Sequence, residues 1–228
     1  SCYFTAKISY LIVYPKAKQG AVPHGKSQRV VITGYGVVSP LGNSTEETYE
    51  AIKQNQSGVK YLEEFRRYNG LSCMIGAPAK PLNEKLIPRQ HRRSMGPLAV
   101  YAAFAADEAV KRSGLPPELL GDPRTGCIIG STTGSATVME ESFRTILSKC
   151  DMKELSSTQF FKCVSHTASM NTAMHLGING CQLSPAGACA SGLQATGLAY
   201  QLIRSGVMDR AVCGGADELN ILVSATFD

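Results

Sequence analysis

The sequence predicts an α/β fold in which a mixed or parallel sheet is covered by helices, and three observations lead to it. Short apolar runs without polar alternation recur, as at residues 126–130, and such runs are typical of strands buried on both faces. Segments with helical periodicity alternate with them, most clearly at residues 97–113. The chain has 228 residues, of which 43% are hydrophobic and 18% charged, and this suits one domain with its own core.

Short local signals mark the elements in the first third of the chain. Residues 29–33 form a β-branched strand that we expect to end in a turn at residues 34–36, which read Gly-Tyr-Gly. The motif Ser-Thr-Glu-Glu fits a capping box and predicts a helix over residues 44–56. Residues 59–88 are rich in Gly, Pro and Asn, so we expect irregular structure there.

The longest predicted helix spans residues 97–113. Pro97 suits its first turn and Gly114 suits its C-cap. Its apolar residues recur at i, i+3 and i+4 spacing, and the many alanines among them indicate close packing against a neighbouring element. The remaining predicted elements are a strand at 126–130, helices at 135–147 and 165–176, a strand at 180–186, a helix at 191–205, a strand at 210–214 and a helix that begins near Asp217.

The charge of the chain is concentrated in its first 28 residues. These contain four lysines and no acidic residue, whereas the rest of the chain has 19 basic and 18 acidic residues, so most of the total charge of +5 lies in this segment. The rest of the chain carries a net charge of only +1, which does not indicate nucleic-acid binding. No apolar run approaches the ~20 residues of a membrane span, so we expect no membrane insertion.

The same segment differs from a secretion signal. Residue 1 is Ser, and the apolar stretch at residues 9–14 is too short for a signal peptide. We therefore expect residues 1–28 to be a leader or disordered extension, and residues 29–228 to form the domain. We expect a cytoplasmic protein, or an organellar one if the leader is a transit peptide.

Eight cysteines are spread along the chain without a CxxC pair or a Cys/His cluster of zinc spacing. We therefore expect no metal site. Cysteines among apolar neighbours, such as Cys127, are typical of small buried side chains in a reducing compartment.

Cys189 has the surroundings of a nucleophile. It follows a predicted strand and a tight turn of small residues, and it precedes a helix rich in Ala and Gly. The N-terminus of a helix presents unpaired N–H groups and a partial positive charge, which favour a thiolate and can stabilise an oxyanion. On these features alone, a buried cysteine in a close-packed turn stays open as the alternative interpretation.

Several motifs in order along the chain carry a family resemblance. The segment around Cys189, GACASG, resembles the nucleophile segment of the β-ketoacyl-acyl-carrier-protein synthases, which have the thiolase-like fold. Residues 29–43 (RVVITGYGVVSPLGN), 122–131 (DPRTGCIIGS) and 209–219 (DRAVCGGADEL) resemble the opening strand and two later strands of that family. The resemblance is closest to the elongating condensing enzymes of dissociated fatty acid synthesis. It covers about residues 29–228 and implies the N-terminal βαβαβ-type half of the thiolase-like fold.

This resemblance implies a 3-oxoacyl-acyl-carrier-protein synthase. Cys189 would take the acyl group as a thioester, and decarboxylation of malonyl-carrier protein would give a carbanion that attacks this thioester. Such a decarboxylative Claisen condensation uses no metal and no redox cofactor, so we expect none. The family's two catalytic histidines belong to its C-terminal half, and the four histidines here match neither motif. We therefore expect the 228 residues alone to be inactive in condensation.

The resemblance also implies binding residues. Arg89, Arg93 and Lys153 match positions at which the family docks its acidic acyl carrier protein, although on charge alone these side chains suit a solvated surface. Thr133 matches a loop that reaches the acyl pocket at the dimer interface. Residues 179–186 resemble the strand that pairs across the family's two-fold axis, so a homodimer is expected of the full-length protein.

Other interpretations stay open. A polyketide ketosynthase would share these motifs, and a non-catalytic subunit such as a chain-length factor would typically lack a nucleophile at Cys189. An unrelated cysteine hydrolase would need His166 as a base close to Cys189. Residues 34–39 read Gly-x-Gly-x-x-Ser, and we reject a nicotinamide site there because the third glycine is missing and Pro40 follows.

Overall fold

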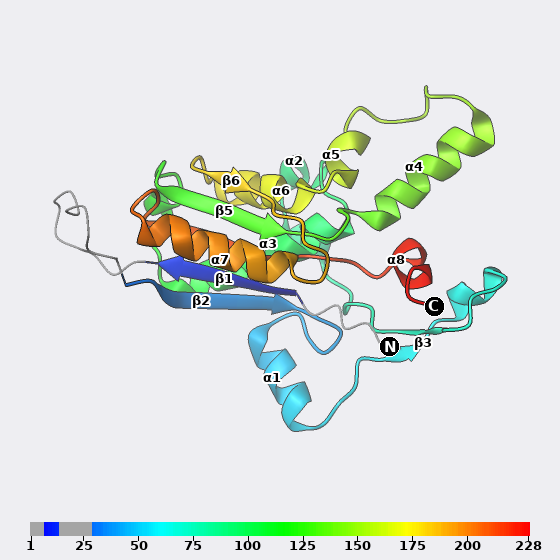
Figure 1. The fold of residues 1–228 in the computed structure, drawn as a ribbon, viewed down its shortest axis with the longest axis horizontal. Coiled ribbons are helices and arrows are strands. Elements are labelled where there is room, and N and C mark those ends of the chain that lie inside the picture. Colours follow the sequence, from blue (N-terminus) through cyan, green and yellow to red (C-terminus); the bar gives the residue numbers. More distant parts are fainter. Residues whose placement is uncertain (1–6, 14–28) are drawn as a thin grey trace.

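Five strands form one mixed sheet with helices on both faces in the computed structural model, which describes residues 7–13 and 29–228 (Figure 1). The strands are β1 (Lys7–Val13), β2 (Val31–Val38), β3 (Lys60–Tyr61), β4 (Ile75–Gly76), β5 (Thr125–Gly130), β6 (Gln182–Leu183) and β7 (Arg210–Gly215). The order in the main sheet is β2-β1-β7-β5-β6, while β3 and β4 pair separately. β5, β6 and β7 run parallel, and β1 is antiparallel to both of its neighbours. The predicted mixed sheet is therefore confirmed.

The helices form the outer layers. They are α1 (Thr45–Lys53), α2 (Arg89–Arg92), α3 (Pro97–Ser113), α4 (Ala136–Lys149), α5 (Gln159–Cys163), α6 (Thr167–Leu176), α7 (Ser191–Arg204) and α8 (Ile221–Ala225), and the 3-10 turns are η1 (Glu63–Arg67), η2 (Glu84–Leu86) and η3 (Pro117–Leu119). α7 crosses in front of the sheet in Figure 1, and α3 and α6 pack on the opposite face. No helix in the described ranges is both long enough and apolar enough to cross a membrane.

The core follows from the alternation of side chains along β5 and β7. Cys127 and Ile129 on β5 pack with Val212 of β7 against α3 and α6. Ile128 and Cys213 point the other way and pack against α7. Because successive residues of a strand face opposite sides of the sheet, each apolar run fills two cores. The result is a three-layer arrangement of helices, sheet and helices.

Most predicted helices lie where their local signals indicate. α3 has the predicted bounds, and Gly114 adopts the left-handed C-cap conformation with a φ of 64°. α1 begins after Ser44, whose hydroxyl accepts a hydrogen bond of 3.2 Å from the N–H of Glu47. This confirms the predicted cap.

The expected turn at residues 34–36 is wrong, because β2 continues through both glycines. A Cβ at Gly34 would clash with the carbonyl oxygen of Ala109, and one at Gly36 would clash with that of Ala105. The glycines therefore allow α3 to lie directly on β2. The alanines of α3 form the other side of the same close contact.

The expectation that residues 1–28 lie outside the fold is wrong for Lys7–Val13, which forms β1. This strand pairs with β2 on one side and with β7 on the other. It thereby supplies hydrogen-bond partners to the backbone edges of both neighbours. Residues 1–6 and 14–28, on which the rest of that expectation falls, lie outside the described residues.

Two further elements differ in extent from the prediction. The strand expected at 180–186 is reduced to β6, and Pro185, which has no N–H, cannot extend the ladder. The helix expected near Asp217 is α8, which starts later because Asn220 is its N-cap.

The described cysteines differ in burial, and two of them, Cys163 and Cys181, are partly buried. Cys127 and Cys213 are buried, and burial raises the pKa of each thiol to about 12. This confirms the expectation for Cys127. Cys73, Cys150 and Cys189 are exposed, so the interpretation as buried side chains is wrong for them.

Candidate active site

The loops that follow β5, β6 and β7 lie along one edge of the sheet. Because these strands are parallel, their carboxyl ends meet at the same edge, where open α/β sheets usually place their sites. The loops comprise residues 131–135, 184–190 and 216–220. The structure therefore brings Thr133 and Cys189 to one edge.

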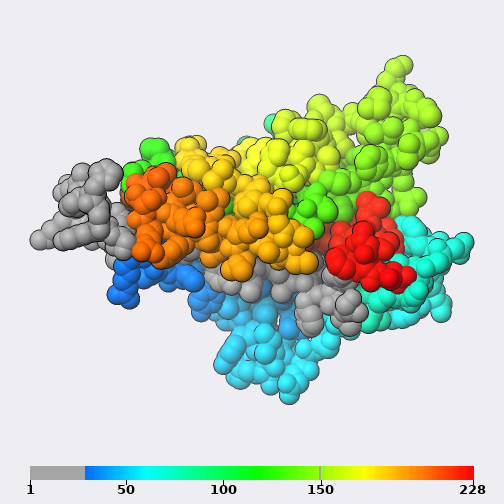
Figure 2. Space-filling view, in the orientation of Figure 1, coloured from blue at the N-terminus to red at the C-terminus, as the bar shows by residue number. Residues whose placement is uncertain are grey.

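Cys189 lies on a sharp turn between β6 and α7. The residue before it, Ala188, has a φ of 49°, in the left-handed region that side chains with a Cβ rarely adopt. The buried hydroxyl of Ser191 accepts a hydrogen bond of 2.9 Å from the N–H of Gly187. The Cys189 side chain is exposed. The chain that leads into α7, coloured yellow to orange, lies on the surface shown in Figure 2.

Glycines allow three backbone segments to converge beneath this turn. A Cβ at Gly130, the last residue of β5, would clash with the carbonyl oxygen of Ser191. A Cβ at Gly192 would lie 3.1 Å from the Cα and N atoms of Gly215, the last residue of β7. Larger residues at these positions would move the N-terminus of α7 away from the strand ends. The small residues of this region thus hold the Cys189 turn against the sheet.

The turn suits a thiol nucleophile at a helix N-terminus. α7 has 14 residues and begins two positions after Cys189. Within the described chain, the backbone N–H of Cys189 makes no hydrogen bond, so it is available to a negatively charged oxygen on a group attached to the thiol. The N–H groups of the next two residues bond to the carbonyls of Gly187 and Ala188, which fixes the turn.

Thr133 is exposed in the loop that follows β5. Asp217 holds this loop: its carboxylate accepts hydrogen bonds from the N–H of Thr132 at 2.9 Å and from the hydroxyl of Ser131 at 3.3 Å. The Ser131 hydroxyl in turn accepts a hydrogen bond of 3.0 Å from the N–H of Gly134. Thr133 therefore lies on a loop fixed from β7, although no hydrogen bond joins it to Cys189 in the described chain.

Glu218 is the residue of this edge that sequence reasoning missed. Its buried carboxylate accepts hydrogen bonds from the N–H of Leu98 at 2.8 Å, the N–H of Thr137 at 2.6 Å and the hydroxyl of Ser135 at 3.0 Å. These groups belong to the first turns of α3 and α4, whose N–H groups have no partners inside their helices. One carboxylate thus caps two helices. The signal in the sequence is an acidic pair directly after a buried strand, which also suits a helix start.

Arg89 and Arg93 form an exposed basic pair on α2 and its C-cap. They are one helical turn apart, since the N–H of Arg93 bonds to the carbonyl of Arg89 at 3.1 Å. Neither guanidinium forms an ion pair within the described part of the chain. Lys153 is also exposed, but it lies on the separate loop between α4 and α5. The structure brings the two arginines together and leaves Lys153 on a different segment.

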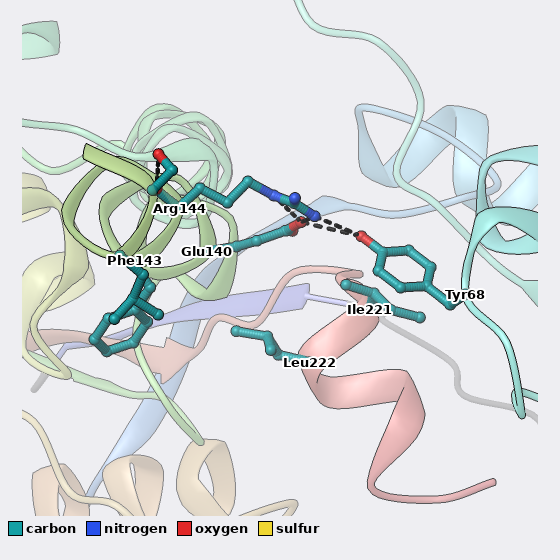
Figure 3. Close-up of a pocket in the computed structure, with 8 residues that line it drawn as sticks. Tyr68, Glu140, Phe143, Arg144, Ile221 and Leu222 are labelled. Carbon is teal, nitrogen blue, oxygen red and sulfur yellow. Dashed lines mark hydrogen bonds and ion pairs between the residues drawn. The ribbon is translucent and has the colours of Figure 1, made fainter. Parts of the chain in front are cut away.

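A cavity of about 630 Å³ opens between α4, α8 and the chain after η1 (Figure 3). Phe143, Ile221 and Leu222 give it an apolar lining. At one end Glu140, Arg144 and Tyr68 are hydrogen-bonded to one another, as the dashed lines in Figure 3 show. Neither Thr133 nor Cys189 lines this cavity.

His166 is the N-cap of α6 and is exposed. In the described chain no hydrogen bond joins it to Cys189, so the structure gives the hydrolase alternative no support. The same residues contain no group of three His, Cys, Asp or Glu side chains that could hold a metal ion.

The fold and the site define the class as an α/β protein with a mixed sheet and an exposed cysteine before the start of a helix, at the carboxyl edge of that sheet. Within that class, residues 27–228 match the family described as Beta-ketoacyl synthase, N-terminal domain, and the chain belongs to this family. The resemblance stated from the motifs is therefore confirmed.

Curated relatives agree with this membership. The chain is 31% identical over 205 residues to 3-oxoacyl-[acyl-carrier-protein] synthase 1 of Haemophilus influenzae, covering 88% of this chain and 49% of the relative. It is 28% identical over 202 residues to the protein of the same name in Escherichia coli K12, covering 88% of this chain and 50% of the relative. The chain thus spans about half the length of the curated relatives it matches.

Solved structures confirm the thiolase-like fold class. A β-ketoacyl synthase from Burkholderia phymatum superimposes with a TM-score of 0.80 at 32% identity, covering 87% of this chain and 49% of that one. The ishigamide ketosynthase/chain length factor superimposes with a TM-score of 0.79 at 26% identity, covering 89% of this chain and 50% of that one.

Proposed function

We propose that Cys189 is the acyl-accepting nucleophile of a 3-oxoacyl-acyl-carrier-protein synthase. The observation that carries the proposal is the exposed Cys189 thiol on a strained turn at the start of α7, in a chain of the β-ketoacyl synthase family. The names of the curated relatives supply the reaction and the carrier protein.

The first half-reaction follows from this geometry. The Cys189 thiolate attacks the carbonyl carbon of an acyl thioester on the carrier protein, and a tetrahedral oxyanion forms. The unused N–H of Cys189 donates to that oxyanion. Collapse of the intermediate breaks the bond to the carrier thiol, which leaves as a thiolate, and the acyl group stays on Cys189.

In the second half-reaction, malonyl-carrier protein loses CO₂ and its carbanion attacks the Cys189 thioester. A carbon–carbon bond forms, the Cys189 thiolate leaves, and 3-oxoacyl-carrier protein is released. We propose that this step requires groups beyond the 228 residues. Supporting this, no histidine of the described chain is hydrogen-bonded to Cys189, and the chain spans half the length of its relatives.

Carrier-protein docking and dimerisation belong to the same proposal. Arg89 and Arg93 offer two unpaired cations on one helical turn to an acidic partner, with Lys153 as a further, separate contact. Thr133 would contact the acyl chain from the loop beside the nucleophile. β6 is an edge strand of the sheet, which suits pairing with a second copy of the full-length protein.

A polyketide ketosynthase is the second candidate, because the ishigamide ketosynthase/chain length factor shares the fold at 26% identity. Both candidates use Cys189 in the same way and differ in the acyl group transferred. The cysteine itself favours either of them over a non-catalytic subunit.

Acyl transfer to the 228-residue chain tests the proposal. The chain is incubated with carrier protein charged with fatty acyl groups or with a polyketide, and the modified peptide is identified by mass spectrometry. We expect a hydroxylamine-labile thioester on Cys189, absent from Cys189→Ala and retained in Cys73→Ala, which removes another exposed thiol. Transfer to Cys73 or Cys150 at the same rate would contradict the assignment.

A further inference from the structure

We infer that His91 and His175 form a binding site for a divalent transition-metal ion such as Zn²⁺, held between α2 and α6. Spacing along the sequence predicts no metal site, because these histidines are 84 residues apart and only the fold brings them together. Neither residue belongs to the proposed machinery at Cys189. The site therefore goes beyond the proposed function and does not depend on acyl transfer.

The two imidazoles face each other through the same ring nitrogen. Nδ1 of His91 on α2 lies 3.3 Å from Nδ1 of His175 on α6. Two nitrogens bound to one tetrahedral zinc ion at about 2.0–2.1 Å lie about 3.3–3.4 Å apart, so the observed distance suits two ligands of one ion. Within the described chain neither Nδ1 has another hydrogen-bond partner. Both nitrogens can therefore turn to a metal.

The far nitrogen of each ring is held by a further side chain. Nε2 of His175 lies 2.9 Å from a carboxylate oxygen of Asp107 on α3. This carboxylate only accepts, so neutral His175 carries its proton on Nε2 and presents a bare Nδ1. A carboxylate behind a histidine is the usual outer partner in metal sites, because it fixes the tautomer and makes the imidazole a stronger ligand.

Gln90 holds the other ring in the same way. Its side-chain amide lies 3.2 Å from Nε2 of His91. With the amide oxygen turned toward the ring, it accepts the Nε2 proton and leaves Nδ1 of His91 bare as well. The two inner nitrogens are then both ligands, and the two outer nitrogens both donate.

Buried hydrogen bonds fix the distance between the two histidines. The hydroxyl of Ser94, three residues after His91, donates to the side-chain oxygen of Asn171 at 2.7 Å. The side-chain N–H of Asn171, one helical turn before His175, donates to the Ser94 carbonyl at 3.0 Å. Asn171 is fully buried. Because these bonds do not involve the imidazoles, α2 stays on α6 with or without an ion, and binding has little to order.

Water completes the coordination of the ion. The described residues contain no group of three His, Cys, Asp or Glu side chains that could hold a metal, so the protein supplies two ligands. His91 is only partly buried, and its ring can rotate to direct Nδ1 at an ion that water reaches from outside.

The ligand type determines which ions the site prefers. Imidazole suits Zn²⁺, Cu²⁺ and Ni²⁺, whereas Mg²⁺ and Ca²⁺ prefer oxygen ligands. Arg89, Arg92 and Arg93 on α2 repel a cation, so we expect weaker binding than in sites with four protein ligands.

Imidazole ¹⁵N NMR of the 228-residue chain during a Zn²⁺ titration tests the site directly. The exposed thiols are first blocked with iodoacetamide, since cysteines also bind Zn²⁺. We expect the Nδ1 signals of His91 and His175 to shift together with one apparent Kd. The signals of His166, which is exposed at the N-cap of α6, should not move with them. Mg²⁺ should shift none of the three.

Substitutions then separate the ligands from their outer partner. His91→Ala and His175→Ala should each lower the Zn²⁺ affinity by more than tenfold, while the control His166→Ala should keep the wild-type affinity. Asp107→Asn leaves both ligands in place and removes the charge behind His175. It should lower the affinity about tenfold, as the loss of an outer partner does in metal sites.

Three results would overturn the site: a Zn²⁺ shift at only one of the two histidines, a shift at Nε2 in place of Nδ1, or equal affinities for the wild type and His91→Ala. The titration in the wild type is decisive even if a variant fails to fold. Acyl transfer to Cys189 enters none of these measurements, so their failure would leave the proposed function unaffected.

Discussion

The Ser191 hydroxyl donates a hydrogen bond of 2.6 Å to the backbone carbonyl of Ala188, the left-handed residue directly before Cys189. The same hydroxyl accepts a hydrogen bond from the N–H of Gly187. Ser191 is buried, so water cannot replace either bond. One side chain therefore closes the turn that presents Cys189.

Replacing this hydroxyl should weaken both the fold and the site. Ser191→Ala leaves the partly buried N–H of Gly187 without its acceptor, which costs about 1 kcal/mol of the free energy of unfolding. Urea denaturation measures this loss, and the alkylation rate of Cys189 should fall with it. Ser205→Ala, which removes an exposed hydroxyl at the other end of α7, is the matched control and should change neither. If Cys189 in Ser191→Ala were alkylated as fast as in the wild type, the turn would not depend on this hydrogen bond.

The contact between β2 and α3 predicts a large effect of one added methyl group. In Gly36→Ala the Cβ would clash with the backbone carbonyl of Ala105, which cannot rotate away as a side chain could. We expect a loss of about 3 kcal/mol or more in unfolding free energy. Gly197→Ala is the control, because a Cβ there meets open space and should stabilise α7 by up to ~1 kcal/mol. Equal stabilities for the two variants would mean that α3 does not lie directly on β2.

The same contact shows what the sequence could not reveal. The bounds of α3 were predictable because Pro97 and Gly114 act locally on their own backbone. Gly34 and Gly36 suggested a turn because the partners that require them, Ala109 and Ala105, are distant in the sequence. A dipeptide pattern cannot distinguish a glycine needed for a turn from one needed for close packing.

The residues of the candidate site differ in the same way. The position of Cys189 on a turn before a helix was predictable because its strand, small-residue turn and helix are consecutive in the chain. Glu218 was not, because its partners Leu98 and Thr137 belong to two helices that precede it by at least 80 residues. β1 was missed because its apolar run was compared with a targeting signal, and only the assembled sheet shows the position between β2 and β7 that it fills.

The Glu140 carboxylate predicts a pH dependence of stability. Hydrogen bonding to Arg144 is the largest cause that lowers the pKa of Glu140, and hydrogen bonds from Asn220 and Tyr68 act in the same direction. Because the pKa is lower in the folded state, this stabilisation is fully present above the unfolded value of about 4.3 and is lost as pH falls through the folded value.

Glu140→Gln should therefore be less stable than the wild type by about 1 kcal/mol at pH 7, and the difference should shrink below about pH 4. Urea denaturation at pH 7, 5 and 3.5 measures it. Glu141→Gln, next to it but exposed, should show no such trend. A difference independent of pH would contradict the role assigned to the charge of Glu140.

The docking proposal predicts a selective effect at Arg93. In Arg93→Glu we expect acyl transfer from carrier protein to slow about tenfold, because reversing the charge repels an acidic partner. Transfer from a small acyl thioester should be unchanged, since Arg93 is not part of the Cys189 turn. Lys60→Glu reverses the charge of an exposed residue on β3 and is the matched control. Equal loss with both donors in Arg93→Glu would rule out docking as the role of Arg93.

The most direct measurement of the central claim is the site-resolved rate of alkylation by iodoacetamide at neutral pH. Cys73, Cys150 and Cys189 are all exposed, so accessibility alone predicts similar rates for the three, while Cys127 and Cys213 should stay unmodified in the folded chain. A nucleophile at the N-terminus of α7 should react about five to ten times faster than Cys73, from a preference of about 1 kcal/mol for negative charge at a helix start. Equal rates at Cys73 and Cys189 would contradict the assignment of Cys189 as an activated nucleophile.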